Sequence, residues 1–412
     1  MQSLALIVLL WAAIGTLVVG WVGRETFVAL WREPMLKHPV LIIESDDWGA
    51  GPVGQAQRLE RIAATLAPHA DGLGRKPVMT LGMVLGVPDG ARILADGLRR
   101  HYRKSLDHPE FASTLAVIKQ GVESGVFAVQ LHGEEHYWPP ALLIAAHDTA
   151  SVTEWLSSSD APLTEDLPAA LQSRWIDATE LPSRPLSTDE IRIAALGEAK
   201  SFGRIFGRGP TVAVPPTFIW NDAVEAAWAE AGVRFVVTPG RRYQARDADG
   251  EPAAAGPGIA NGDRGAAGIT YVVRDDYFEP IRGHRAERGI TALAAKTRVG
   301  RPTLLETHRV NFLEDAAAAD SLGELNRLLT LALRSFPNVR FLCTEELASA
   351  MCTDDPRLIE RRFGSRLHIW LRRLWCVARL RKLACLTGVI APAWLLYALT
   401  WRGTRAPGSS AG

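Results

Sequence analysis

The chain has 412 residues, and its 46 Lys and Arg against 45 Asp and Glu give a formal net charge of +1. This balance lacks the basic excess typical of nucleic-acid-binding proteins, so we expect no nucleic acid as a partner. The length exceeds that of one large α/β domain of about 250 residues, yet the sequence shows no repeat and no second catalytic pattern. The cysteines are scattered without a Cys-x-x-Cys pair, which predicts neither a cysteine zinc site nor a disulfide scaffold.

The first predicted element is an apolar, uncharged run over residues 4–22. It is long enough to cross a bilayer core at about 1.5 Å per residue. A cleaved signal peptide is less favoured, because no Lys or Arg precedes the run, its apolar core is too long, and no Ala-x-Ala site follows it. We therefore interpret residues 1–24 as a retained transmembrane anchor.

A buried strand is predicted next, because four aliphatic residues open the stretch from Val40 to Gly49. Asp46 and Asp47 follow where this strand should end, and the carboxyl ends of parallel strands are where ligands bind in α/β folds. Two adjacent carboxylates cost free energy there unless a cation or a shared proton offsets them. The pair therefore predicts a metal ion nearby.

A second apolar run, over residues 126–131, leads to His132 and His136. Their i, i+4 spacing would place both imidazoles on one face of a helical turn. Together with a carboxylate, they suit a tetrahedral zinc with an open position for a water whose pKa the metal lowers. Manganese, cobalt and iron accept the same ligands. The His-x-x-x-His pattern is a weak signal alone and gains weight from the Asp46-Asp47 pair.

A third strand, predicted over residues 301–308, delivers His308 to its carboxyl end, where it is a natural general acid. Helical stretches lie between many of the strand-like runs, which predicts a parallel α/β architecture. The stretch 241–268 is rich in Gly, Ala and Asp and is predicted to be a mobile surface loop. The strand-like runs lie at 39–44, 77–84, 126–131, 211–215, 233–238, 268–273, 302–307 and 339–343.

These motifs resemble those of the polysaccharide deacetylases of the NodB-homology type (carbohydrate esterase family 4). The resemblance spans about residues 38–350, and we assign residues 38–355 to the catalytic domain. It implies a distorted (β/α) barrel with seven or eight strands and the removal of acetyl groups from a sugar. The matching stretches are Ser45–Gly49, His132–His136, Val214–Asn221, Glu306–His308 and Phe341–Leu347.

The resemblance also implies a role for each matching residue. Asp46 would be the general base, and Asp47, His132 and His136 would hold Zn²⁺ or another divalent metal. Metal-bound water would attack the acyl carbon, and His308 would protonate the leaving amine or alcohol. The implied substrate is an acetylated polysaccharide or a lipid-linked saccharide.

The third motif departs from the family pattern, which carries an Arg that pairs with the base. No Arg lies within residues 215–220, so Arg274 is a candidate substitute. Asp275 or Asp276 could equally tune His308. Backbone N–H groups near the third motif could hold the oxyanion. The candidates for these substrate and oxyanion contacts are Pro216, Thr217, Trp220, Arg274 and Asp275.

The end of the chain combines cations and apolar residues. Residues 356–382 are predicted to form a basic amphipathic helix that lies on an anionic membrane face. The alternative is a basic helix packed on the barrel. An apolar membrane segment follows over 383–401, interrupted by Gly388 and Pro392, and it could span or re-enter the membrane. Residues 402–412 are predicted to form a disordered tail.

Cations follow the first apolar run and precede the second, so at both ends of the chain they lie next to the catalytic domain. By the positive-inside rule, this distribution predicts a catalytic domain on the cytoplasmic side. The membrane is expected to be a bacterial inner membrane. This location would suit an enzyme that acts on lipid-linked saccharides before export.

Two other functions stay open. A glycoside-processing hydrolase also uses two carboxylates, but they must face each other across about 5 Å or more, which adjacent residues such as Asp46 and Asp47 fit poorly. The other is a catalytically degenerate membrane scaffold that keeps a deacetylase-like barrel, which the altered third motif leaves open.

Overall fold

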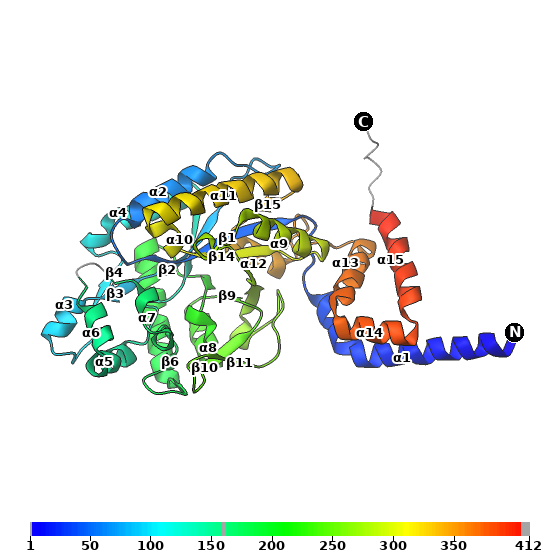
Figure 1. Cartoon of the computed structure of the whole chain (residues 1–412), viewed down its shortest axis with the longest axis horizontal. Helices are drawn as coiled ribbons and strands as arrows, with labels where there is room; N and C mark the ends of the chain where they lie inside the picture. Colours follow the sequence, from blue (N-terminus) through cyan, green and yellow to red (C-terminus); the bar gives the residue numbers. More distant parts are fainter. Residues whose placement is uncertain (1, 159–161, 405–412) are drawn as a thin grey trace.

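The computed structural model describes residues 2–158 and 162–404. A body built around one curled sheet carries a group of helices that projects from one side (Figure 1). We call this group the terminal helices. They are α1 (Gln2–Arg32), α13 (Phe363–Cys376), α14 (Ala378–Thr387) and α15 (Ile390–Thr404).

The central sheet is parallel and has the strand order β12-β9-β8-β5-β2-β1-β14-β13, with β15 paired to β1. Each predicted strand-like run contains one of these strands, which confirms the expected α/β architecture. No pairing joins β12 to β13 among the described residues, so the sheet curls without closing. The strands are β1 (Val40–Gly49), β2 (Met79–Val84), β5 (Phe127–Leu131), β8 (Val212–Ala213), β9 (Phe235–Thr238), β12 (Thr270–Val273), β13 (Asp276–Tyr277), β14 (Thr303–His308) and β15 (Arg340–Phe341).

Helices surround this sheet, and their apolar faces bury its strands. One of the longest, α7, begins with a capping box formed by Ser187 and Glu190. The helices of the body are α2 (Gln55–Leu66), α3 (Gly90–Ala95), α4 (Ala112–Glu123), α5 (Pro139–Asp148), α6 (Ala150–Leu156), α7 (Thr188–Phe206), α8 (Asp222–Glu230), α9 (Ala286–Arg298), α10 (Val310–Leu313), α11 (Asp315–Ser335) and α12 (Thr344–Thr353).

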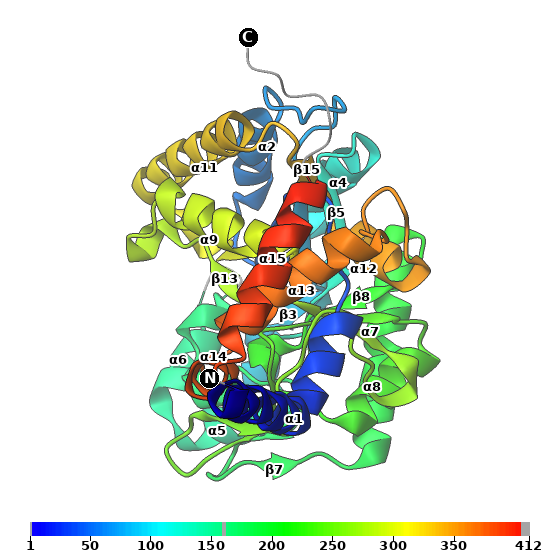
Figure 2. The same ribbon diagram turned by 90° about the vertical axis from the view of Figure 1, so that its right-hand side faces the viewer.

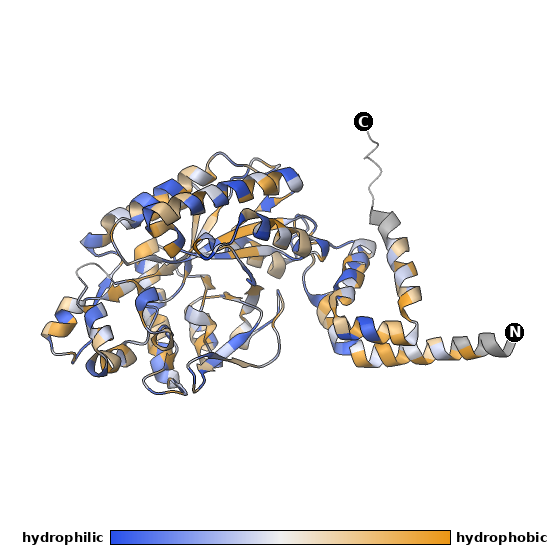
Figure 3. Cartoon of the chain, viewed as in Figure 1, coloured by the Kyte–Doolittle hydropathy of each residue, from blue (hydrophilic) through white to orange (hydrophobic). Residues whose placement is uncertain are grey.

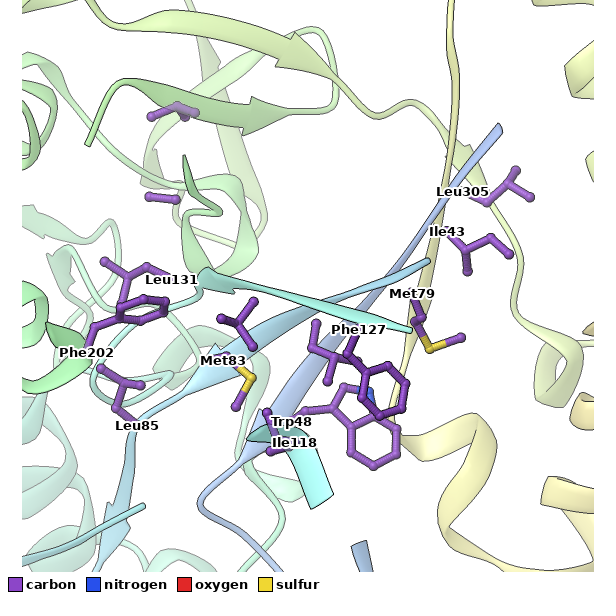
Figure 4. Packing of buried hydrophobic residues seen from close by; sticks show 14 of the residues in the cluster. Ile43, Trp48, Met79, Met83, Leu85, Ile118, Phe127, Leu131, Phe202 and Leu305 are labelled. Atoms are coloured by element: carbon purple, nitrogen blue, oxygen red, sulfur yellow. The ribbon is translucent and has the colours of Figure 1, made fainter. Parts of the chain in front are cut away.

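The core packs aliphatic and aromatic side chains between the strands and these helices (Figure 4). Every residue of β1 is buried, as expected for a parallel strand that is covered on both faces. Ile43, Met79 and Leu305 come from three neighbouring strands, and each is at most 2% exposed. The strands are therefore a rigid support for the residues at their carboxyl ends.

The stretch predicted as a mobile loop, 241–268, instead contains an antiparallel hairpin of β10 (Arg242–Arg246) and β11 (Pro252–Ala255). This hairpin has a weak sequence signal, because β11 consists of Pro and Ala and lacks the β-branched residues that mark strands. The hairpin is tied to the body through Arg246, which is buried and donates from Nε to Ser173 Oγ at 3.1 Å. Two further small ladders pair β3 (Gly86–Pro88) with β4 (Arg103–Ser105) and β6 (Ile176–Asp177) with β7 (Arg184–Pro185).

Helix α1 continues past the predicted anchor boundary at residue 24, because nothing interrupts it before Pro34. Its stretch Leu10–Arg32 is the one helix in the described ranges that is long and apolar enough by itself to cross a membrane. Hydrophobic residues recur along the part of this helix that is drawn in colour in Figure 3.

The C-terminal helices divide at other residues than predicted. The expected helix over 356–382 is broken at Val377, and α14 ends at Gly388, whose φ of 75° stops the helix. Helices α14 and α15 are long and apolar enough to cross a membrane only when they are taken together, and they are bent by 113° at the break between them. Residues 402–404 of the predicted tail belong to α15, and 405–412 lie outside the described residues.

The terminal helices join the body at the amino ends of β1 and β14. Figure 2 looks along α1 from its N-terminal side and shows α13 and α15 above it, in front of the body. Arg373 of α13 is 2% exposed and donates to five backbone carbonyls of the segments that enter these strands. Glu33 pairs with both Arg373 and Arg301. The carbonyls belong to Leu30, Glu33, Pro34, Val299 and Gly300.

Candidate metal centre and active site

Asp46 and Asp47 lie at the carboxyl end of β1 and face different groups. The register between β1 and β2 shifts between Ser45 and Trp48, and Asp47 has a φ of 72°. A positive φ is costly for a residue with a side chain and is typical of functional sites. The irregularity turns two neighbouring carboxylates apart, so each can take a separate role.

The structure brings the three predicted metal ligands together. Asp47 Oδ1 lies 3.3 Å from His132 Nε2 and 3.6 Å from His136 Nε2. One ligand atom from each residue falls within 4.8 Å of the others. The Nδ1 atom of His132 lies 2.9 Å from the Val214 carbonyl oxygen, which orients the ring so that Nε2 faces Asp47.

The chemistry of this cluster fits a divalent metal. All three residues are buried, and Asp47 Oδ1 has no hydrogen-bond donor among the described residues. A buried carboxylate oxygen without a donor, facing two ring nitrogens, is a costly arrangement that a cation relieves. Burial lowers the pKa of His136 to about 4, so its ring is neutral at pH 7, as a ligand must be. Two imidazoles and one carboxylate suit zinc and similar ions.

The expected helical turn between the histidines is not present. Residues 132–138 form an irregular loop after β5, and Gly133 has a φ of 118°. Buried charges hold this loop in place of helical hydrogen bonds: Glu135, which is fully buried, accepts from Arg174 Nη1 at 2.8 Å and also from Arg103. His132 and His136 therefore lie close together because of the conformation of this loop, and not because of the helical turn that their spacing predicted.

Asp46 is paired with Arg274, the candidate substitute for the missing Arg of the third motif. Arg274 Nη2 donates to Asp46 Oδ2 at 2.6 Å, and Nη1 donates to Glu44 Oε2 at 2.5 Å. Its Nε lies 3.1 Å from Glu306 Oε2. Burial raises the pKa of Asp46, but the charge and hydrogen bond of Arg274, together with the nearby rings of His132 and His308, outweigh this effect and hold that pKa below its usual value. Asp46 is therefore ionised at neutral pH.

Space for the Asp46 carboxylate depends on Gly82 of the neighbouring strand β2. A Cβ atom at Gly82 would collide with Asp46 Oδ1, which itself has no hydrogen-bond partner among the described residues. Asp46 is also the register partner of His308 on β14. One carboxylate oxygen is thus fixed by Arg274, and the other is left without a protein partner.

His308 is held by a carboxylate that the sequence did not indicate. Its Nδ1 lies 2.6 Å from Glu279 Oε1, and Asn311 donates to the other oxygen of Glu279. Burial lowers the pKa of His308, but the hydrogen bond to Glu279 and the charge of Asp47 outweigh it and raise this pKa to about 10. Its side chain is 30% exposed, so the protonated ring can be reached from outside.

The alternative partners for His308 lie elsewhere. Asp275 accepts from Lys296 Nζ at 2.5 Å at the surface, and Asp276 lies 3.8 Å from the same ammonium group. Both carboxylates are therefore engaged by a lysine and do not tune His308 by contact.

The remaining candidates occupy the turn after β8. Thr217 has a φ of 54°, and its hydroxyl lies 2.9 Å from Ser173 Oγ. Pro216 has no N–H, so only Thr217 of this pair could offer a backbone donor to an oxyanion. Trp220 is 1% exposed and donates its indole N–H to Glu225 at 2.7 Å, so it packs in the core and does not face a substrate.

Sequence reasoning missed four acidic residues around the centre. Glu44 and Glu306 interrupt the apolar runs of β1 and β14, and such an interruption was the signal available for them. Glu279 carries no comparable signal. Glu165, from the segment between α6 and α7, accepts from Arg309 at 2.9 Å and 3.1 Å, and Arg309 is the residue that follows His308.

No family model matches the sequence, and a search of curated proteins finds no match. Solved structures with a similar arrangement do exist. A 4-alpha-glucanotransferase from Thermococcus litoralis is 10% identical with a TM-score of 0.39, and the match covers 76% of this chain and 40% of that protein. The chain therefore spans less than half of the glucanotransferase.

Two deacetylases match over nearly their whole length. A peptidoglycan deacetylase from Bacillus subtilis is 11% identical with a TM-score of 0.36, covering 78% of this chain and 95% of that one. A putative polysaccharide deacetylase from Mycobacterium smegmatis is 12% identical with a TM-score of 0.37, covering 79% and 93%. At identities and TM-scores this low, the matches say nothing about function, which depends on the residues of the site.

Proposed function

We propose that the chain is a metal-dependent carbohydrate deacetylase that removes acetyl groups from an acetylated saccharide. The observation that carries this proposal is the convergence of Asp47, His132 and His136, whose ligand atoms lie within 4.8 Å of one another. Next to it stands a base and acid pair, Asp46 and His308, on adjacent strands. A metal-dependent hydrolase of acyl groups can work with these three components, a metal site, a base and an acid.

A divalent metal held by Asp47, His132 and His136 would activate water and stabilise negative charge that develops on the acyl oxygen. Asp46, kept ionised by Arg274, accepts the proton from the attacking water through its free Oδ1. His308, kept protonated by Glu279, donates a proton to the leaving amine or alcohol. The Thr217 N–H is the backbone candidate for the oxyanion.

The same proposal includes attachment to a membrane through α1, within Leu10–Arg32. We place it at a bacterial inner membrane, and the distribution of cations favours a catalytic body on the cytoplasmic side. Protease added to sealed, right-side-out vesicles tests the sidedness. Cleavage within the exposed part of 240–265 before lysis would reverse the assignment, and protection until lysis would support it.

The catalytic proposal is tested by metal analysis and by acetate release from an acetylated chitooligosaccharide. We expect about one divalent ion per chain and measurable acetate release from the wild type. Asp47→Ala should lose the ion and lower kcat/KM by at least about a thousandfold, since the metal contributes several kcal/mol to the transition state. Asp275→Ala, which removes a surface carboxylate engaged by Lys296, is the matched control and should keep both.

Two outcomes would replace the proposal. Sugar-chain cleavage without acetate would favour a glycoside-processing hydrolase. Wild-type protein that binds no divalent metal and releases no acetate would favour a degenerate scaffold.

A further inference from the structure

A large cavity lies among the four terminal helices, apart from the catalytic centre. Its volume is about 900 Å³, within the range of about 300–1,000 Å³ typical of small-molecule pockets. Each terminal helix contributes apolar side chains to its wall. They include Phe27 of α1, Trp370 of α13, Leu380 of α14 and Trp394 of α15.

Cations are among the residues that line this apolar cavity. Arg298 of α9 and Arg381 of α14 line it, both are exposed, and neither forms an ion pair with any described residue. No Asp or Glu follows Glu360 in the sequence, so nothing acidic in the later helices offsets them. An apolar interior lined by guanidinium groups that no described carboxylate pairs complements a ligand with a hydrocarbon chain and an anionic head group.

The surroundings of the cavity also point to a bilayer. Helix α1 forms one wall, and its large side chains that face outward are exposed, as Trp11, Leu17 and Trp21 show at 60%, 72% and 72%. Trp394 of α15 lines the cavity and is 65% exposed. Exposed apolar surface of this extent marks contact with a membrane or a partner.

We propose that this cavity binds a hydrocarbon chain of an anionic glycerophospholipid, with the lipid phosphate at Arg298 and Arg381. The bound lipid is distinct from the saccharide substrate. Arg298 lies just before β14, and His308 ends that strand, so about 20 Å of strand at about 3.3 Å per residue separates the two. The proposal does not depend on the chain being a deacetylase.

The test uses the full-length protein in detergent, titrated with dioleoyl phosphatidylglycerol or with dioleoyl phosphatidylcholine, and counts bound lipids by native mass spectrometry. We expect one phosphatidylglycerol per chain, bound about tenfold or more tightly than phosphatidylcholine. The double variant Arg298→Gln, Arg381→Gln should lose this preference. Arg379→Gln is the matched control, because Arg379 is exposed on the same helix as Arg381 but lies outside the cavity.

A second pair of variants tests the cavity itself. Ala393→Trp, which fills the cavity, should weaken both lipids by about tenfold or more. Ala391→Trp, on the same helix but outside the lining, should leave both unchanged. Unfolding monitored by circular dichroism shows that each variant is folded. The proposal would be overturned if the two Trp variants bound lipid equally, or if the wild type showed no preference for phosphatidylglycerol. It would also be overturned if the wild type formed a dimer that binds no lipid.

Discussion

Two buried arginines lie at opposite ends of the central sheet and are satisfied in different ways. Arg274, at the carboxyl ends of the strands, is 1% exposed and contacts three carboxylates. Arg373, at the amino ends, is 2% exposed and donates mainly to backbone carbonyls, with Glu33 as its one carboxylate partner among the described residues. Burial alone lowers the pKa of an arginine. The carboxylates raise the pKa of Arg274 well above its usual value, whereas that of Arg373 falls to about 10.

The different partners of Arg274 and Arg373 indicate different roles for the two ends of the sheet. Removing Arg274 would leave several buried anions without a fixed cation, so it organises charge for the catalytic centre. Removing Arg373 would leave neutral carbonyl groups without a donor, so it acts as a joint between the terminal helices and the body. Experiments at the two positions should therefore differ in size and in what they disturb.

The largest effect is expected for Arg274→Met. It should lower the free energy of unfolding by about 3–5 kcal/mol at pH 8, because it leaves buried carboxylates uncompensated. Urea unfolding measures this loss, and the deficit should shrink at low pH as the carboxylates become protonated. Arg192→Met removes the exposed pair with Glu230, which solvent screens, and should lower the free energy of unfolding far less than Arg274→Met. Similar losses at Arg274 and Arg192 would show that the buried cluster is not charged.

A smaller effect is expected for Arg373→Met, about 2 kcal/mol for the unsatisfied carbonyls. It should loosen the terminal helices, so that protease cleavage near 354–362 becomes faster, while acetate release from a soluble substrate stays within about twofold because the strands are intact. Arg379→Met, an exposed cation of α14, is the control. A parallel loss of acetate release would mean that the joint also shapes the catalytic centre.

The smallest of these effects is expected at His308, where a charged partner, Glu279, can be replaced by a neutral one. Glu279→Gln should lower the pKa of His308 from about 10 toward its ordinary value of about 6.5. Because His308 must be protonated to donate, activity is lost as pH rises through this pKa, and the alkaline limb of kcat/KM should move down by at least about one pH unit. The contribution of His308 to folding stability has the same pH dependence. It is present in full below about pH 6.5 and is lost as the pH rises through about 10. An unmoved limb would exclude His308 as the acid.

Much of the fold could be predicted from the sequence. Apolar runs located all eight predicted strands, because parallel strands covered on both faces need continuous aliphatic residues. The metal-ligand cluster could be predicted because its residues end two of these runs. The hairpin over 242–255 could not, since its second strand is made of Pro and Ala and is ordered by contacts elsewhere in the chain.

The electrostatic partners in the site could be predicted only in part. Arg274 meets Asp46 across 228 residues of sequence, and only the missing Arg of the third motif pointed to it. Glu279 resembles any acidic residue before a proline, and Asp275 seemed an equally good neighbour for His308. Which carboxylate reaches the ring depends on how β13 and β14 pair, and that is a property of the folded sheet.

The joint and the catalytic centre occupy opposite ends of the same strands, which sets a stand-off distance. If α1 is embedded in a bilayer, β1 alone holds Asp46 about 20 Å farther from the lipid surface than Val40, at about 3.3 Å per residue. Saccharides that lie flat against the head groups would fall short of the reacting atoms. Long, flexible glycans that extend away from the surface would reach them, so under the proposed function the height of the sheet would select for substrate length.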